Sequence, residues 1–291
     1  MDQTARYDAL VDRVEALYEE QLYREAAALL ASQSGGLEPW AAELAHLEAC
    51  VLGAGGDADA ALRTLQEASA GGAWWVPDIL VDDDDLAGLR GRPEFEALVA
   101  VSAERVADDP APALVDVPEE PVGVVVALHG AGQTAAHARS DWAGVLERGY
   151  TLVCVQSSRR MSPNYRTWPD REHAAADIAA ALAALPESLG LPLIAAGFSA
   201  GGRAALDWAL TGLPRPVAGV LVLAPALREL PSAAGGTLSP ATIWIGSDDD
   251  LLEVVGAAGE QLTSFGCTIE QLPGVGHEFP EDFDELLAKV L

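Results

Sequence analysis

From Val122 onward, short apolar runs rich in β-branched residues alternate with segments of helical periodicity. The runs cover residues 122–128, 151–155, 193–198, 217–224 and 242–245, with a weaker one at 268–272. Because they are continuously apolar rather than alternating, we expect strands that are covered on both faces. Strands separated by helices predict an α/β fold: a mostly parallel, doubly wound sheet with helices on both sides.

Residues 1–105 have helical periodicity throughout and contain a repeated pattern. The small-residue helix entry that ends at Ala26 corresponds to the one that ends at Ala60, 34 positions later. That spacing is typical of a helix-turn-helix solenoid in which a small residue lets paired helices approach closely. The region resembles tetratricopeptide repeats, and this resemblance implies an all-α helical domain before the sheet.

A stretch rich in proline and acidic residues separates the two patterns. It runs over residues 106–121, and a short edge strand is expected within it at 113–117. We therefore expect three parts: a tetratricopeptide-like helical domain at 1–105, a linker at 106–121 and the α/β domain at 122–291.

The charge balance of the chain argues against two classes of partner. Lys and Arg total 17 against 45 Asp and Glu, which gives a formal net charge of −28 at pH 7. A surface this negative repels phosphate backbones and anionic lipids, so neither nucleic acid nor a membrane is expected as a partner. The N-terminus has no signal-peptide pattern, and no apolar stretch approaches the ~18 residues of a membrane helix. We expect a soluble cytoplasmic protein.

Neither the cysteines nor an acidic run favours a metal site in the sequence. The cysteines, Cys50, Cys154 and Cys267, are odd in number and far apart, which fits a reducing compartment rather than a disulfide scaffold or a metal knuckle. The run Asp82–Asp85 either binds a cation or is a solvated loop that caps the next helix, and the second interpretation is favoured because alternating ligand spacing is missing. His46 is interpreted as a surface or core residue of a helix.

The motif with the clearest chemistry surrounds Ser199. It covers residues 197–201, where an apolar run ends and a helical pattern begins. A strand, a sharp turn and a helix in this order would lift a serine hydroxyl above the carboxyl edge of a sheet, with glycines where side chains would collide. The motif predicts a nucleophile, and the alternative is a structural glycine-rich turn.

A second motif, from His129 to Gly132, ends the strand expected at 122–128. A strand that ends in small residues leaves backbone N–H groups free to face a ligand. One of them, together with the Ala200 N–H, is suited to hold the negative oxygen of a tetrahedral intermediate. The alternative is an ordinary tight turn, with His129 orienting the loop.

Two further strand ends carry the remaining partners. Asp248, Asp249 and Asp250 follow the run at 242–245, and any of these carboxylates could orient a histidine ring. His277 lies between a glycine turn and a proline-started helix, on a loop from which it could reach Ser199 and take its proton.

The order of these motifs, with the 129–132 loop first and then Ser199, Asp and His277, resembles the α/β-hydrolase superfamily of carboxylesterase, phospholipase and dienelactone-hydrolase type. The resemblance implies Asp249 as the triad acid, with Asp250 and then Asp248 as alternatives. It implies oxyanion N–H groups on Ala131 and Ala200. It also implies a substrate pocket lined by the loop at 156–170, which holds Arg159, Met161, Tyr165 and Trp168.

We therefore expect a serine hydrolase that acts on small-molecule carboxylic esters through an acyl-enzyme, with no metal or organic cofactor. The alternatives are a peptidase or thioesterase on the same fold, or a protein-interaction module with a vestigial hydrolase domain. The helical domain is expected to bind a protein partner or to mediate self-association.

Overall fold

The computed structural model describes residues 3–185, 190–232 and 238–291, so the remaining parts of the expected domains lie outside the described residues. The chain divides into two compact units. The first comprises Met1–Asp108 and Arg160–Tyr165, and the second comprises Asp109–Arg159 and Arg166–Leu291. The division falls inside the expected linker. The assignment of Arg160–Tyr165 to the helical unit was not predicted.

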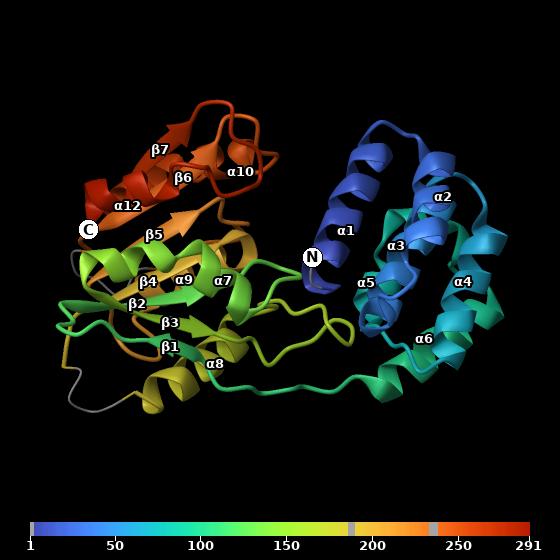
Figure 1. The fold of residues 1–291 in the computed structure, drawn as a ribbon, viewed down its shortest axis with the longest axis horizontal. Coiled ribbons are helices and arrows are strands. Elements are labelled where there is room, and N and C mark those ends of the chain that lie inside the picture. Colours follow the sequence, from blue (N-terminus) through green and yellow to red (C-terminus); the bar gives the residue numbers. More distant parts are fainter. Residues whose placement is uncertain (1–2, 186–189, 233–237) are drawn as a thin grey trace. The chain divides into compact units, whose positions relative to one another are not determined.

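The first unit is all-helical (Figure 1). Each of the first four α-helices packs on the helix that follows it in the chain, up to the contact of the third with the fourth. Its elements are α1 (Gln3–Glu19), α2 (Tyr23–Gln33), η1 (Glu38–Trp40), α3 (Ala41–Ala54), α4 (Ala58–Ala70), α5 (Pro77–Val81), η2 (Asp84–Leu89) and α6 (Pro93–Arg105).

The small residue at the α3–α4 contact differs from the expected one. Ala26 is fully buried, as the repeat pattern implies, but Ala60 is only partly buried. Ala61, one position further along α4, is fully buried instead. The fully buried small residues of α2 and α4 are therefore 35 positions apart (61 − 26), one more than the repeat pattern implied.

One glycine allows α3 to approach the acidic run closely. A Cβ on Gly53 would lie 2.1 Å from the Asp85 carbonyl oxygen. Any side chain at this position would push η2 and the preceding residues away from α3. Asp83 caps η2, because its Oδ1 accepts a hydrogen bond from the Asp85 N–H at 2.9 Å. The acidic run therefore caps a helical turn, and it does so packed against α3.

The second unit contains a seven-stranded sheet in the order β1-β3-β2-β4-β5-β6-β7 (Figure 1). All neighbouring strands are parallel except β1, which pairs with β3 in the antiparallel sense at one edge. The strands are β1 (Leu114–Asp116), β2 (Gly123–Leu128), β3 (Tyr150–Val155), β4 (Leu193–Phe198), β5 (Gly219–Leu223), β6 (Ala241–Gly246) and β7 (Thr268–Leu272).

Helices flank the sheet, and every residue of β2, β4, β5 and β6 is buried, as the continuous apolar runs predicted. Helix α9 packs on β4, β5 and α8, whereas η3 packs on β3 and α12. The flanking elements are α7 (Ala135–Asp141), η3 (Ala143–Arg148), α8 (Arg171–Ala183), α9 (Ser199–Thr211), α10 (Leu252–Ala257), α11 (Gly259–Ser264) and α12 (Phe283–Val290). Within the described ranges, no helix combines the length and the apolar character needed to cross a membrane.

Candidate active site

Ser199 lies at the sharp turn between β4 and α9. Its φ is +52°, in the left-handed region that side-chain-bearing residues rarely adopt. A Cβ on Gly197 would lie 2.4 Å from the Gly201 carbonyl oxygen, and one on Gly201 would lie 2.2 Å from the Leu128 carbonyl oxygen. The two glycines therefore let β4, α9 and the end of β2 meet without a clash. The turn leaves Ser199 half-buried at the carboxyl end of the central strands.

His277 lies on the loop after β7, and its ring nitrogen Nε2 is 3.0 Å from the Ser199 hydroxyl oxygen. The loop is held against the end of β6, because the Asp248 N–H donates to the Val275 carbonyl oxygen at 3.0 Å. The Phe198 ring packs on the imidazole with centroids 4.9 Å apart. The His277 side chain is 39% exposed, which leaves the ring accessible to solvent.

Asp249 contacts the other ring nitrogen of His277. Its Oδ2 is 2.9 Å from His277 Nδ1, and its Oδ1 accepts a hydrogen bond from the Leu251 N–H at 2.7 Å. The carboxylate side chain is fully buried. Asp248 is exposed and accepts a hydrogen bond from its neighbour Ser247, and Asp250 is exposed. Of the three adjacent aspartates, Asp249 is therefore the one that can orient the imidazole.

Among the described residues, the backbone N–H groups of Ala131 and Ala200 have no hydrogen-bond partner. The other N–H groups of the 130–132 loop are occupied. Gly130 donates to the Gln133 side chain at 2.9 Å, and Gly132 donates to the Arg166 carbonyl at 2.9 Å. Because Ala200 is in the first turn of α9, its N–H also lies at the positive end of the helix dipole.

The loop after β2 rests on a buried histidine. Burial lowers the pKa of His129 to about 4, so the ring is neutral at pH 7. Its Nδ1 lies 2.7 Å from the Gly130 carbonyl oxygen and its Nε2 accepts from the Ser157 N–H at 3.2 Å, which assigns the proton to Nδ1. This ring therefore orients the loop that carries Ala131.

The four residues expected to line the substrate pocket are divided between the two units. Met161 and Tyr165 belong to the first unit, where the Met161 carbonyl accepts a hydrogen bond from the Val76 N–H at 2.7 Å. Arg159 is partly buried in the second unit. Trp168 is only 1% exposed, so its place as a pocket wall is corrected: the side chain is part of the core.

The sequence did not indicate the supporting role of Trp168. Its indole N–H donates to the His129 carbonyl oxygen at 2.8 Å, and the Trp168 carbonyl oxygen accepts a hydrogen bond from Arg203. Burial lowers the pKa of Arg203, which lies 4.0 Å from Asp207. The sequence feature that could have indicated this network is the charged pair Arg203 and Asp207, in a helix whose other residues are mostly small or apolar.

Two solved structures with a TM-score of 0.50 agree with this fold. The chain is similar to an uncharacterized protein from Bacillus cereus ATCC 10987, with a TM-score of 0.50, 24% identity, and coverage of 97% of this chain and 96% of that one. It is also similar to TT1662 from Thermus thermophilus, with a TM-score of 0.50, 18% identity, and coverage of 64% and 96%. A further similarity is to a phospholipase/carboxylesterase from Dyadobacter fermentans DSM 18053, with a TM-score of 0.46, 18% identity, and coverage of 63% and 96%.

The first unit has its own match. Residues 6–109 match the family model described as the A/B hydrolase-like, N-terminal domain. This is an α/β-hydrolase-fold protein. The tetratricopeptide resemblance of the helical unit is not confirmed, because the family that matches it is a domain associated with this fold. No curated protein matches the sequence significantly.

Proposed function

We propose that the second unit is a serine hydrolase that cleaves carboxylic esters through a Ser-His-Asp acyl-enzyme mechanism. The observation that carries the proposal is the continuous chain of contacts from Ser199 through His277 to the buried Asp249, with atom-to-atom distances of 3.0 and 2.9 Å. A hydroxyl, a ring that can take its proton and a carboxylate that orients the ring are together the requirements for activating a serine.

In the proposed reaction, Ser199 Oγ attacks the ester carbonyl carbon while His277 Nε2 takes the hydroxyl proton. The buried Asp249 carboxylate stabilises the imidazolium that forms. The carbonyl oxygen becomes negative and accepts hydrogen bonds from the Ala131 and Ala200 N–H groups, each of which supplies about 2.7–4 kcal/mol in comparable sites. His277 then returns the proton to the leaving alcohol, and an acyl group remains on Ser199.

Water completes the cycle by the same route. His277 takes a proton from the water molecule, whose oxygen attacks the acyl carbon, and the second tetrahedral intermediate collapses to release the acid and restore the Ser199 hydroxyl. His277 returns the proton that it took from water to Ser199 Oγ, so the ring is neutral again at the end of the cycle.

The test is labelling of the full chain with a fluorophosphonate probe, alongside hydrolysis of p-nitrophenyl acetate. We expect covalent labelling of Ser199, and we expect Ser199→Ala to abolish both labelling and turnover while unfolding at nearly the same temperature. Ser140→Ala, at an exposed serine on α7, is the matched control. Persistent turnover in Ser199→Ala would refute the proposal. A preference for acyl-thioesters or aminoacyl amides in a substrate panel would assign the activity to a thioesterase or peptidase instead.

A further inference from the structure

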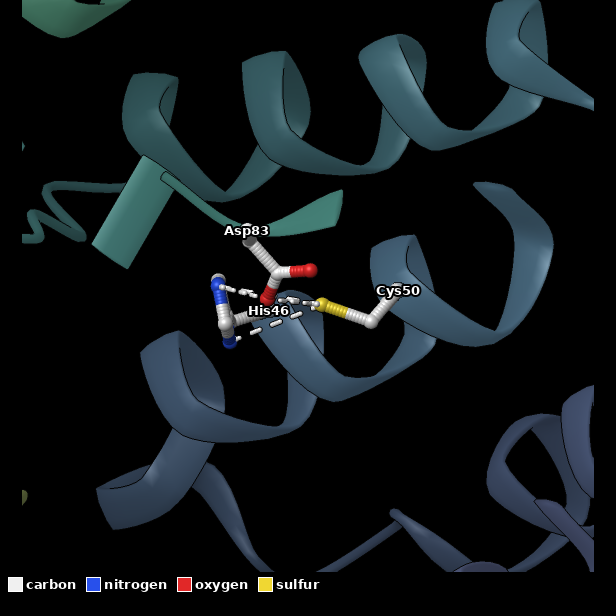
Figure 2. A group of neighbouring side chains, drawn as sticks. All are labelled: His46, Cys50 and Asp83. Carbon is white, nitrogen blue, oxygen red and sulfur yellow. Dashed lines mark hydrogen bonds and ion pairs between the residues drawn. The ribbon is translucent and has the colours of Figure 1, made fainter. Parts of the chain in front are cut away.

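The first unit contains three side chains of metal-ligand type that converge on one point (Figure 2). His46 and Cys50 are four residues apart on α3 and so share one face of that helix. Asp83 comes from the acidic run that Gly53 allows to pack against α3. Cys50 Sγ lies 3.3 Å from Asp83 Oδ2 and 3.8 Å from both ring nitrogens of His46. One ligand atom from each of the three side chains lies within 4.8 Å of the other two.

These separations are close to those of a zinc site. With Zn–S of about 2.3 Å and Zn–N and Zn–O of about 2.0–2.2 Å, neighbouring donors of a tetrahedral ion lie roughly 3.4–3.6 Å apart. The Cys50–Asp83 and Cys50–His46 separations differ from that range by a few tenths of an ångström. The three donor atoms lie within 4.8 Å of one another, and the His46 ring nitrogen that is 3.7 Å from Asp83 Oδ2 is Nε2, so the side chains must move to place one ion among Nδ1, the thiolate and the carboxylate.

Two of the donors are oriented by backbone groups, as metal ligands commonly are. His46 Nε2 lies 3.0 Å from the Ile79 carbonyl oxygen and can donate to it, which leaves a lone pair on Nδ1. Asp83 Oδ1 accepts from the Asp85 N–H, which leaves Oδ2 for a ligand. Asp85 is engaged elsewhere, because both of its carboxylate oxygens are within 2.9 Å of the Tyr18 hydroxyl.

The cluster opens into a cavity of about 680 Å³ whose charge suits a cation. The lining includes six acidic side chains and no arginine or lysine; the acidic members are Glu15, Glu43, Asp78, Asp82, Asp83 and Asp85. Glu43, three residues before His46 on α3, is only 8% exposed. Its Oε1 accepts from the Ser162 hydroxyl at 2.6 Å, but its buried Oε2 has no hydrogen-bond partner among the described residues. A buried carboxylate oxygen without a donor is costly, and a ligand in the cavity would relieve that cost.

We propose that His46, Cys50 and Asp83 bind a divalent first-row transition metal, Zn²⁺ foremost, with a fourth coordination position open to the cavity. The mixture of thiolate, imidazole and carboxylate selects such an ion over Mg²⁺ or Ca²⁺, which prefer oxygen ligands alone. Binding replaces the Cys50 S–H···Asp83 hydrogen bond with a metal–thiolate bond, and the thiol proton leaves to solvent. Water or a ligand in the cavity occupies the fourth position, as in zinc sites with three protein ligands.

The test uses the full chain freed of metal by dialysis against a chelator and titrated with Co²⁺. We expect one equivalent to bind with a thiolate-to-metal charge-transfer band and intense d–d bands of a tetrahedral site. Zn²⁺ should displace Co²⁺ with loss of both. We expect Cys50→Ser and Asp83→Asn to weaken Zn²⁺ binding by at least about 100-fold.

Two control variants separate this site from adventitious binding to an acidic protein. Asp84→Asn removes an exposed carboxylate next to Asp83, and Cys267→Ser removes a buried free thiol of the second unit. Both should bind like the wild type. Co²⁺ that binds without the charge-transfer band, or Zn²⁺ affinity unchanged in Cys50→Ser, would overturn the proposal. If Cys50→Ser does not fold, as judged by circular dichroism, the wild-type Co²⁺ spectrum decides alone.

Discussion

The run of three adjacent aspartates after β6 permits a demanding test of the proposed mechanism. We expect Asp249→Asn to lower kcat/KM for p-nitrophenyl acetate by about 10⁴-fold, which corresponds to roughly 5.5 kcal/mol of transition-state stabilisation. Asp248→Asn and Asp250→Asn change the charge by the same amount within two residues of this site. Because both of these carboxylates are exposed, we expect each to alter kcat/KM by less than about threefold.

The magnitude follows from the hydrogen bonds of Asp249. Its Oδ1 accepts from the Leu251 N–H at 2.7 Å, so an asparagine must keep its carbonyl oxygen on that side. The amide NH₂ then faces His277 Nδ1 at the position of Oδ2, 2.9 Å away. A donor at this point requires a lone pair on Nδ1 and therefore places the ring proton on Nε2. That tautomer cannot accept the proton of Ser199, although the fold and the shape of the site are retained.

The assay compares initial rates for the three variants after active-site titration with a fluorophosphonate, and thermal unfolding confirms that each variant is folded. Loss of labelling rate should parallel the loss of kcat/KM in Asp249→Asn, because both depend on serine activation. The reasoning is refuted if Asp249→Asn keeps more than a tenth of the wild-type kcat/KM, or if Asp250→Asn loses as much as Asp249→Asn.

Three further predictions concern stability and positioning. Gly201→Ala places a Cβ 2.2 Å from the Leu128 carbonyl oxygen, so we expect the free energy of unfolding, measured in urea, to fall by about 3 kcal/mol or more. Trp168→Phe removes the hydrogen bond to the His129 carbonyl, and we expect about a tenfold lower kcat with a smaller change in KM, measured by steady-state kinetics. Burial raises the pKa of Asp141 from 3.8 to about 6, so the free energy of unfolding falls as pH rises between these values. After allowance for partial exposure, we expect Asp141→Asn to stabilise the protein by about 1 kcal/mol at pH 8 and to have no effect below pH 3.8. Thermal unfolding at both pH values measures the difference.

The strands could be predicted because their sequence pattern depends on local burial alone. A strand covered on both faces needs apolar residues at every position, and the run at 193–198 matches the fully buried strand β4 residue for residue. The run at 217–224 is longer than β5, which covers Gly219–Leu223. Apolar character continues into the turn after β5, where Ala224 adopts a φ of +47° and leaves the extended conformation.

The family resemblance implied Asp249 among the three aspartates, but the residues themselves left the choice open, because all three follow the same strand and have the same side chain. Burial and the Leu251 N–H distinguish Asp249, and both depend on how the turn after β6 closes. Trp168 illustrates the same limit. An aromatic residue in a loop near a predicted site suits a pocket wall, but the direction of the side chain is decided by the His129 carbonyl that it contacts.

The convergence of the proposed triad could be predicted from the sequence, whereas the convergence of the proposed metal ligands could not. Ser199, Asp249 and His277 each follow a parallel strand, and the carboxyl ends of parallel strands meet at one edge, so sequence order alone implies that they converge. Asp83 is separated from Cys50 by 33 residues, and only the close packing of α3 on the acidic run at Gly53 joins them. A helix face carries no comparable rule for which loop it will contact. A histidine and a cysteine four residues apart therefore become chemically informative only when a third donor is found opposite them. In this chain that donor comes from a run whose sequence favoured a helix cap over a cation site.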